Sequence, residues 1–380
     1  MRPAAASALW LPLAGLLVFG VCFSATLGFL DVSIPDVVAI LWARLTGQPL
    51  PAGIDPVAAT VVADVRLPRI LAAVLVGGML GVSGAVFQAI LLNPLADSYT
   101  LGISTGAAFG ASLVIVLQIF GLMLPVGVSV PVFAFAGGVA TLAVVLFLAS
   151  GDRSLSSTSL ILAGVIVSAI LSAAIGFLKF LADEQVGIII FWLMGSLAGA
   201  TWPNIGLLAP TALFGTLVML FYGRDLNIMA TGDRAATSLG VQTVRLRTVL
   251  LATGTLLTSL AVSVSGIIGF VGLIVPHLLR HLVGPDNRRL IPLSFLTGGL
   301  LLLSPTPSPG RPCPRRCPSA CSPPCSAGPS SASSSNDGSA MAPATSDRAD
   351  LPLWSLAGLD FGYGERMVLR DVSLELPPGR

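Results

Sequence analysis

The stretch Thr248–Pro276 reads "TVLLATGTLLTSLAVSVSGIIGFVGLIVP" and contains no charged residue. A helix crosses the hydrocarbon core of a bilayer with about 20 apolar residues, so this run is too long for one crossing. Glycine interrupts helices readily, and Gly266 and Gly269 lie in the second half of the run. We therefore expect two membrane helices here, with a break at the glycines and the second helix continuing to about Val283.

The same composition extends over most of the 380 residues, of which 54% are hydrophobic and 10% charged, with a mean hydropathy of +0.90. A soluble domain carries about 25% charged residues, so an ordinary soluble protein is excluded. The net charge of +2 gives no argument for a nucleic-acid partner. We expect an all-α polytopic membrane protein. Its other helices should lie in the apolar runs Leu9–Leu30, Ile70–Leu92, Leu101–Leu124, Val126–Ser150, Leu160–Ala182, Asn204–Tyr222 and the short Leu290–Leu303.

Basic side chains in short loops indicate orientation, because they stay on the cytoplasmic side of a membrane. If each run crosses once, most arginines share one face, and this face and the N-terminus are predicted to be cytoplasmic. The arginines of this face are Arg2, Arg153, Arg224, Arg234, Arg245, Arg247, Arg280, Arg288 and Arg289. The other face carries Arg44, Arg66, Arg69 and, near a helix end, Lys179.

Arg66 and Arg69 run against this asymmetry, in the stretch "VRLPRIL". Proline suits the first turn of a helix, so a helix is predicted to begin at Pro68 with both arginines at the external membrane surface. One interpretation is structural, since arginines bind lipid phosphates and cap neighbouring helices. The other is an electropositive surface that receives acidic side chains of an external partner.

The stretch "NPLADSYTLGISTGAAFG" runs from Asn93 to Gly110. Asn93 and Pro94 stop one helix, and the glycines that follow recur every four residues on one face of the next. Such a face permits close helix packing, and it equally exposes backbone to a translocation pathway. Asn93, Pro94, Gly102 and Gly106 are therefore pathway candidates, with packing as the alternative.

The longest charged loop between the apolar runs, "RDLNIMATGDRAATSLGVQTVRLR", begins at Arg224. Its centre is predicted to form a short helix over Ala235–Leu239, with Thr231 or Asp233 as the N-cap and Gly240 as the stop. An amphipathic helix of this kind lies in the lipid interface or fits a groove on a cytosolic partner.

No metal site is predicted. His277 and His281, the only histidines, lie four residues apart on one helical face, where an interfacial role is more common than metal binding or proton transfer. Four cysteines lie in a proline-rich stretch with no hydrophobic residues to fold around zinc. They are Cys313, Cys317, Cys321 and Cys325. The membrane region also shows no nucleophile–base constellation and essentially no carboxylate, which argues against an ion-driven secondary transporter.

The composition changes at Ser304. From there to Ala340 the chain has no Val, Ile, Leu, Phe, Trp or Tyr, so it cannot bury enough apolar surface to offset its chain entropy. We expect a disordered segment over residues 304–350 and a short β-prone fragment over 351–380. Because the change falls inside an apolar run, we infer a frameshift near Leu303, with a natural linker between fused domains as the alternative.

Several stretches together resemble the FecCD-type permease family of ABC importers for iron-siderophores, haem and vitamin B12. They are "RLPRILAAVLVGG", "GAVFQAILLNPLADSYTLGISTGAAFGA", "FWLMGSLAGATW", "GDRAATSLGV" and "GFVGLIVPHLLRHLVGPDNRRLIP". The resemblance covers about Leu9 to Leu303. It implies a ten-helix permease fold, truncated here after about nine helices within residues 1–303. It also implies a cytoplasmic (inner) membrane protein that works as a homodimer or heterodimer, with substrate moving along the subunit interface.

The resemblance also implies partners. Arg66 and Arg69 would dock glutamates of a periplasmic or lipid-anchored substrate-binding protein. The charged loop would contact a separate ABC ATPase through Gly232, Asp233, Arg234, Ala235, Ala236, Ser238, Leu239 and Gly240. The expected function is that of a permease subunit, not an enzyme, which translocates a metal chelate on energy supplied by the ATPase.

The C-terminal stretch "LDFGYGERMVLRDVSLELPPGR" resembles the start of such an ATPase, with Tyr363 at the place of the aromatic residue that stacks on adenine. The chain has no phosphate-binding motif G-x-x-x-x-G-K-[ST], so we expect no ATP hydrolysis by it. No cofactor is expected in this chain; ATP and magnesium would belong to the partner ATPase. The alternatives are a permease–ATPase fusion cut short, a non-functional frameshifted product and, less favoured, a secondary transporter.

Overall fold

The computed structural model describes residues 10–26, 32–48, 50, 54–122, 126–151, 155–303, 354–363 and 366–376. The chain divides into two units, Met1–Pro312 and Cys313–Arg380, and each is described by itself. The segment 304–350, which was expected to be disordered, and its four cysteines lie outside the described residues.

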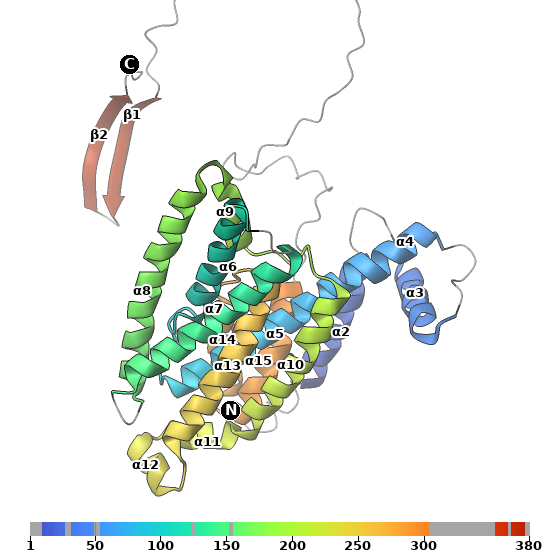
Figure 1. The fold of residues 1–380 in the computed structure, drawn as a ribbon, viewed down its shortest axis with the longest axis horizontal. Helices are drawn as coiled ribbons and strands as arrows, with labels where there is room; N and C mark the ends of the chain where they lie inside the picture. Colours follow the sequence, from blue (N-terminus) through green and yellow to red (C-terminus); the bar gives the residue numbers. More distant parts are fainter. Residues whose placement is uncertain are drawn as a thin grey trace, which may run out of the picture. The chain divides into compact units, whose positions relative to one another are not determined.

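The first unit is a bundle of α-helices (Figure 1). Its longest helices are α5 (Leu67–Ile90), α7 (Val126–Ala149), α8 (Ser157–Ala182), α10 (Trp202–Phe221) and α13 (Thr243–Ser265). Shorter apolar helices are α2 (Trp10–Thr26), α6 (Ile103–Ile119), α14 (Val271–Val283) and α15 (Asn287–Leu303). Between them lie α3 (Ile34–Thr46), α4 (Pro56–Thr60), the π-helical turn η1 (Val61–Arg66), the 3-10 turn η2 (Asp183–Gln185), α9 (Val186–Leu193), α11 (Gly223–Met229) and α12 (Asp233–Ser238). Each predicted apolar run contains a helix, so the all-α class is confirmed.

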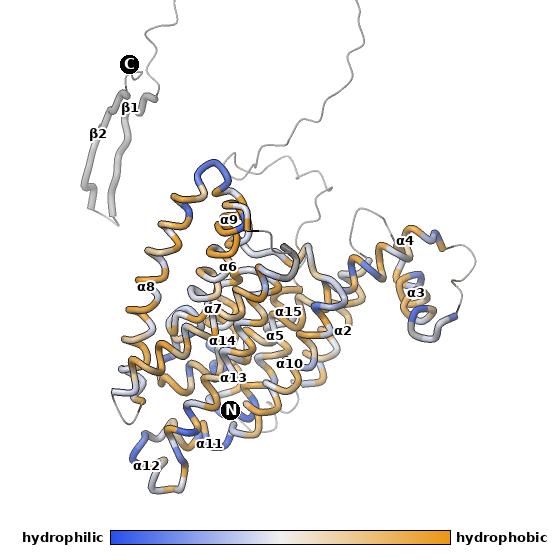
Figure 2. Tube along the Cα trace, viewed as in Figure 1, coloured by the Kyte–Doolittle hydropathy of each residue, from blue (hydrophilic) through white to orange (hydrophobic). Residues whose placement is uncertain are grey.

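Within the described part of the chain, five helical stretches are long and apolar enough to cross a membrane. They are Pro56–Ile90, Ser129–Ala149, Ser157–Leu193, Trp202–Phe221 and Thr243–Ser265. Figure 2 shows hydrophobic residues along most of α8 and α10, while hydrophilic residues gather at α12 and at the end of α8. The chain is therefore a multi-pass membrane protein.

The break predicted within Thr248–Pro276 is confirmed. α13 ends at Ser265, and Gly266 follows with a φ of 68°. A Cβ on Gly266 would lie 2.8 Å from the Cα of Gly195, so this turn needs glycine for space as well as for its backbone angle. The break divides one long apolar run into α13 and the shorter α14.

α5 begins at Leu67 with Pro68 in its first turn, as predicted, but the helical stretch already starts at Pro56 and reaches α5 through α4 and η1. In the π-helical turn the N–H of Leu67 donates to the carbonyl of Val62, five residues back. The same spacing would pair the Ala63 carbonyl with Pro68, which has no N–H. The indole N–H of Trp202 donates to the Ala63 carbonyl instead, at 3.2 Å. A donor from another helix thus replaces the one that proline lacks, and the residues before Pro68, which were not predicted to be helical, form α4 and η1.

The short helix expected in the charged loop is present as α12. Its N-cap is Gly232, with a φ of 104°, and neither Thr231 nor Asp233 caps it. That prediction failed because the Asp233 carboxylate is used by another residue, described below. Helices α3, α9 and α11 were not predicted, since none of them lies within one of the long apolar runs.

Glycines bring the neighbouring helices against α5 at the centre of the bundle. In the stretch Pro56–Ile90, which contains α5, 89% of the apolar 18-residue segment is buried inside the protein. The buried share is 28% in each of the stretches that contain α8 and α10. A Cβ on Gly77, Gly81 or Gly84 would overlap backbone atoms of α15 or α14. On α6, a Cβ on Gly106 or Gly110 would overlap atoms of α7. The four-residue glycine repeats therefore serve close helix packing.

The second unit contains a β-hairpin over part of the fragment expected to be β-prone. Strand β1 (Trp354–Tyr363) pairs antiparallel with β2 (Arg366–Leu376), with Trp354 opposite Leu376 and Tyr363 opposite Arg366. Tyr363 is thus the last residue of β1.

Candidate functional site

The predicted contact loop lies at one end of the bundle, where α11 and α12 connect α10 with α13 (Figure 1). On α12, Ala236 is buried against the bundle, while Arg234 and Ser238 are exposed. Leu239, directly after the helix, is 68% exposed. The outer side of α12 thus offers a charged, a hydroxyl and an apolar group to a partner.

An ion pair fixes α12 to α13. The two Nη atoms of Arg247 donate to the two carboxylate oxygens of Asp233, at 3.0 and 2.8 Å. The side chain of Arg247 is 1% exposed and that of Asp233 is 38% exposed. Because burying a guanidinium is costly unless it is paired, Asp233 and Arg247 hold the start of α12 on the first turns of α13.

A second group of hydrogen bonds ties α11 to the start of α15. Asn227 donates from Nδ2 to Asp286 at 2.7 Å. Its Oδ1 accepts from the backbone N–H and from the Nδ2 of Asn287, at 2.8 and 2.9 Å. Asn287 is 4% exposed. The α11–α12 loop is therefore attached to two helices of the bundle, α13 and α15.

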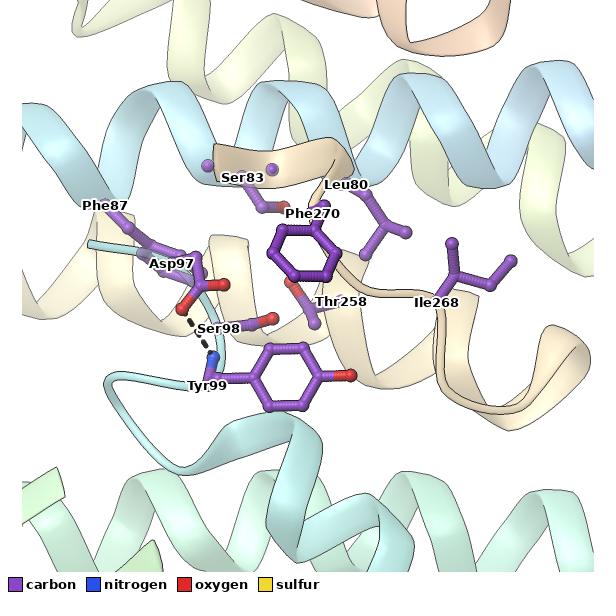
Figure 3. A pocket seen from close by; sticks show the side chains of 11 residues that line it. Leu80, Ser83, Phe87, Asp97, Ser98, Tyr99, Thr258, Ile268 and Phe270 are labelled. Carbon is purple, nitrogen blue, oxygen red and sulfur yellow. Dashed lines mark hydrogen bonds between the residues drawn. The ribbon is translucent and has the colours of Figure 1, made fainter. Parts of the chain in front are cut away.

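A small cavity with a mixed polar and apolar lining lies between α5, the loop before α6, α13 and the start of α14 (Figure 3). It is lined by Leu80, Ser83, Gly84, Phe87, Asp97, Ser98, Tyr99, Thr258, Ile268, Phe270 and Gly272. Thr258 is fully buried, and its hydroxyl has no hydrogen-bond partner among the described residues. The cavity has room for about one water molecule, so it does not fit a bulky substrate.

Asp97 organises the loop at this cavity. Its Oδ1 accepts from the backbone N–H groups of Tyr99 and Thr100, both at 3.0 Å, and from the Thr100 hydroxyl at 2.9 Å. Burial, and to a smaller extent the charge of Asp97, raises the pKa of Tyr99 from 10.0 to about 12. The phenol therefore stays neutral and keeps its proton for hydrogen bonding.

A polar cluster joins α14 to α5. Gln88, 2% exposed, donates from Nε2 to the carbonyls of Gly272 and Leu273 at 3.4 and 3.2 Å. Its Oε1 accepts from Arg280, which also donates to the Ala85 carbonyl at 3.4 Å. These bonds satisfy a buried amide and fix the first turns of α14 against α5.

At the start of α5 the two predicted docking arginines differ. Arg66 donates to the carbonyl of Ala25, in the last turn of α2, at 2.8 Å. This bond caps a neighbouring helix, which is the structural interpretation of Arg66. Arg69 is exposed. Docking of a partner at these residues stays a prediction, and Arg69 is the more accessible of the two.

The pathway candidates do not form one surface. Gly102 and Gly106 are buried, and a Cβ on Gly102 would lie 2.8 Å from the hydroxyl oxygen of Ser168. Asn93 accepts the backbone N–H of Leu95 at 2.9 Å, and Pro94 is exposed. Packing accounts for the two glycines within this subunit, and a role in a pathway stays a prediction.

The two histidines of α14 are exposed, and the rings of His277 and His281 lie edge to face with centroids 5.0 Å apart. Among the residues that the structure describes, no group of three or more His, Cys, Asp or Glu side chains could hold a metal ion.

The bundle and its connecting loop match a known family over nearly their whole length. The model of the FecCD transport family matches residues 16–305, which include the described helices from most of α2 to α15. The chain belongs to the FecCD transport family. The residues that match the FecCD family extend through the end of α15, and the β-hairpin lies beyond them.

Relatives of this FecCD chain are ABC transporter permeases. The uncharacterized ABC transporter permease protein YvrB of Bacillus subtilis is 41% identical over 76% of this chain and 82% of its own length. The cobalamin import system permease protein BtuC of Halobacterium salinarum is 39% identical over 69% of this chain and 71% of its own. A solved structure described as an inward-facing conformation of a metal-chelate type ABC transporter is 32% identical. It covers 78% of this chain and 88% of its own, with a TM-score of 0.66.

Sequence reasoning missed several residues of this FecCD chain. Arg247 was counted only as a positive charge, because its partner Asp233 is 14 residues away and the geometry of α12 was unknown. Asn227 was missed for the same reason. Gln88 could have been found, since an amide in a run of apolar residues needs a buried partner.

Proposed function

We propose that the chain is the transmembrane permease subunit of an ABC importer that moves a metal chelate across the cytoplasmic membrane. The chelate would belong to the iron-siderophore, haem or cobalamin class. The observation that carries this proposal is the family match over the helix bundle, together with a loop that is attached to α13 and α15. One relative is named as a cobalamin import permease, and the similar solved structure is of the metal-chelate type.

Energy would come from a separate ATPase subunit, which binds ATP and magnesium. This chain has no phosphate-binding motif. The ATPase would contact α12 and its flanks, where Arg234, Ser238 and Leu239 are exposed. A motor can shift this subunit only if its ATP-bound and free forms contact the loop differently. The ion pair of Asp233 with Arg247 would carry that difference into α13.

The opposite end of the bundle would receive the substrate-binding protein. Arg69 is exposed there and suits an acidic side chain, whereas Arg66 supports α2. The substrate would then move between two permease subunits, since the cavity inside this one fits only about one water molecule. The N-terminus would be cytoplasmic, on the same face as α12. The hairpin that contains Tyr363 would be a remnant of an ATPase and would take no part in transport.

Reconstitution tests the function. The full chain is placed in proteoliposomes with its ATPase and binding protein, and uptake of a ferric siderophore, haemin and cyanocobalamin is measured. We expect ATP-dependent uptake of one of these chelates and no uptake without the ATPase. ATP hydrolysis by the purified chain alone, or uptake without a motor subunit, would contradict the proposal.

A docking experiment tests the assigned loop. Leu239→Asp should reduce co-purification of the ATPase at least tenfold, because it places a charge at the centre of the proposed interface. Leu50→Asp, at a residue that is 43% exposed and precedes α4, is the matched control and should leave co-purification unchanged. Equal loss in both variants would remove α12 from the interface.

A further inference from the structure

An open pocket lies at the end of α10 and the start of α15. It is lined by Leu220, Asp286, Arg288 and Arg289. Gly223, at the start of α11, packs against Arg288, because a Cβ on Gly223 would lie 3.3 Å from the Cγ of Arg288. Arg224, the next residue, therefore lies near the pocket, although it is not among the lining residues. The start of α11, which carries Arg224, thus lies beside the start of α15, which carries Arg288 and Arg289.

The positive charge of this pocket is only partly neutralised. Arg224 and Arg288 are exposed and make no ion pair among the described residues. Arg289 lies 3.6 Å from Asp286, whose carboxylate also accepts two hydrogen bonds, at 2.7 and 3.1 Å. Even when Asp225 beside Arg224 is included, arginines outnumber carboxylates. The pocket therefore favours an anion.

The pocket lies at the end of a helix that can span a membrane. α10 is long and apolar enough to span a membrane, and it ends at Phe221, next to the pocket. The rings of Phe221 and Tyr222 meet edge to face with centroids 5.1 Å apart, and aromatic rings of this kind are typical of the membrane interface.

An apolar stripe leads from the pocket along α10. Leu213, Leu217 and Phe221 follow one another at four-residue spacing, and they are 64%, 55% and 78% exposed. Residues at this spacing share one side of a helix. The stripe lies on a membrane-spanning helix, where an acyl chain reaches it and a cytosolic protein does not.

We propose that this pocket binds the phosphate-bearing headgroup of an anionic phospholipid, with an acyl chain of the same lipid along the α10 stripe. Guanidinium groups bind phosphate oxygens through paired hydrogen bonds, and basic pockets beside membrane helices attract anionic headgroups. The apolar stripe favours a lipid over an acidic surface of the ATPase. The bound headgroup bridges α11 and α15, the elements that Asn227 and Asn287 already connect.

Native mass spectrometry of the full chain tests this proposal. Purified protein is titrated with phosphatidylglycerol and, separately, with zwitterionic phosphatidylcholine. We expect preferential binding of phosphatidylglycerol, and the double variant Arg224→Gln/Arg288→Gln should weaken it by about fivefold for each charge removed. Arg224→Lys/Arg288→Lys should retain most of the binding, which shows that charge is responsible.

The matched control is Arg234→Gln/Arg245→Gln. It removes two exposed arginines, one on α12 and one on α13, and changes no residue of the pocket lining, so it should bind phosphatidylglycerol like the wild type. Equal losses in both double variants, or no preference for phosphatidylglycerol, would overturn the proposal.

Two further measurements test whether the pocket binds free phosphate or the ATPase instead of a lipid. Displacement of phosphatidylglycerol by millimolar inorganic phosphate would assign the pocket to free phosphate and overturn the lipid assignment. Loss of ATPase co-purification in Arg224→Gln/Arg288→Gln, with lipid binding unchanged, would assign these arginines to the motor interface instead. Failure of transport in the reconstitution would leave the lipid measurement intact, because it needs neither ATPase nor substrate.

Discussion

Two ion pairs at opposite ends of the helix bundle differ in how they are held. Where α12 meets α13, Arg247 is 1% exposed and makes two hydrogen bonds to Asp233. Where α3 meets η1, Arg44 makes one contact to Asp64 at 2.8 Å, and the side chains are 62% and 38% exposed. Both are arginine–aspartate pairs, but only the Arg247–Asp233 pair has a buried side chain. We therefore expect only this pair to resist separation strongly. If the chain works as proposed, the buried pair would transmit a displacement of α12 to α13, whereas the exposed pair would adapt to a partner.

The largest effect is expected from Asp233→Asn. The substitution leaves the Arg247 guanidinium buried without a counter-charge, which costs about 3–5 kcal/mol in comparable cases. Thermal unfolding in detergent, followed by size-exclusion chromatography, should show a clear loss of stability. Asp225→Asn makes the same charge change on α11 and is the control. If both variants unfold alike, the buried pair does not distinguish this end of the bundle.

At the other end, Trp202→Phe should cost about 1–3 kcal/mol, because it leaves the Ala63 carbonyl of the π-helical turn without a donor. The loss should be local. Hydrogen exchange is expected to accelerate in η1 and in the first turn of α5, while α13 stays protected. Trp42→Phe, at a 63% exposed residue of α3, is the control. Unchanged exchange in η1 would mean that another group satisfies this carbonyl.

At the cavity near Tyr99 we expect an effect of intermediate size on the free energy of unfolding, and this effect should depend on pH. An unfolded chain releases a tyrosine proton near pH 10, whereas the folded chain keeps that of Tyr99 until about pH 12. The free energy of unfolding should therefore fall as pH rises between these values. Tyr99→Phe should reduce this slope, and Tyr222→Phe is the matched substitution. A phenolate absorbance from Tyr99 that rises already near pH 10 would contradict the burial of this group.

The smallest effect is expected from Arg44→Gln. Exposed ion pairs contribute about 0–1 kcal/mol, so the unfolding transition should move little and should depend weakly on salt. Asp64→Asn should give the same result, because either change removes the same contact. A loss as large as that of Asp233→Asn would abolish the contrast between the two ends.

The helices of the bundle could be predicted from the sequence because a bilayer sets both their length and their composition. The break at Gly266 was readable for the same reason, since one run was too long for a single crossing. Pro68 correctly indicated the start of α5, but the helical segment before it was not readable. The donor to the Ala63 carbonyl comes from Trp202, which is 139 residues away.

The candidate site was less predictable than the fold. The position of α12 followed from its local pattern, whereas the role of Arg247 depends on how two helices cross. Arg66 and Arg69 look equivalent in the sequence, yet Arg66 bonds to α2 and Arg69 is exposed. Local patterns indicate which residues are charged, and only tertiary packing decides which of them remain accessible.

The glycines of α5 restrict how this subunit can change shape. Near Gly77, Gly81 and Gly84, no side chain separates the backbone of α5 from that of α15 or α14. A sideways step of one helix would drive its Cα atoms into the carbonyl oxygens of the next. Such a step has no soft side chains to absorb it, so we expect α5, α14 and α15 to move together. Any opening and closing is therefore expected at the borders of this three-helix block.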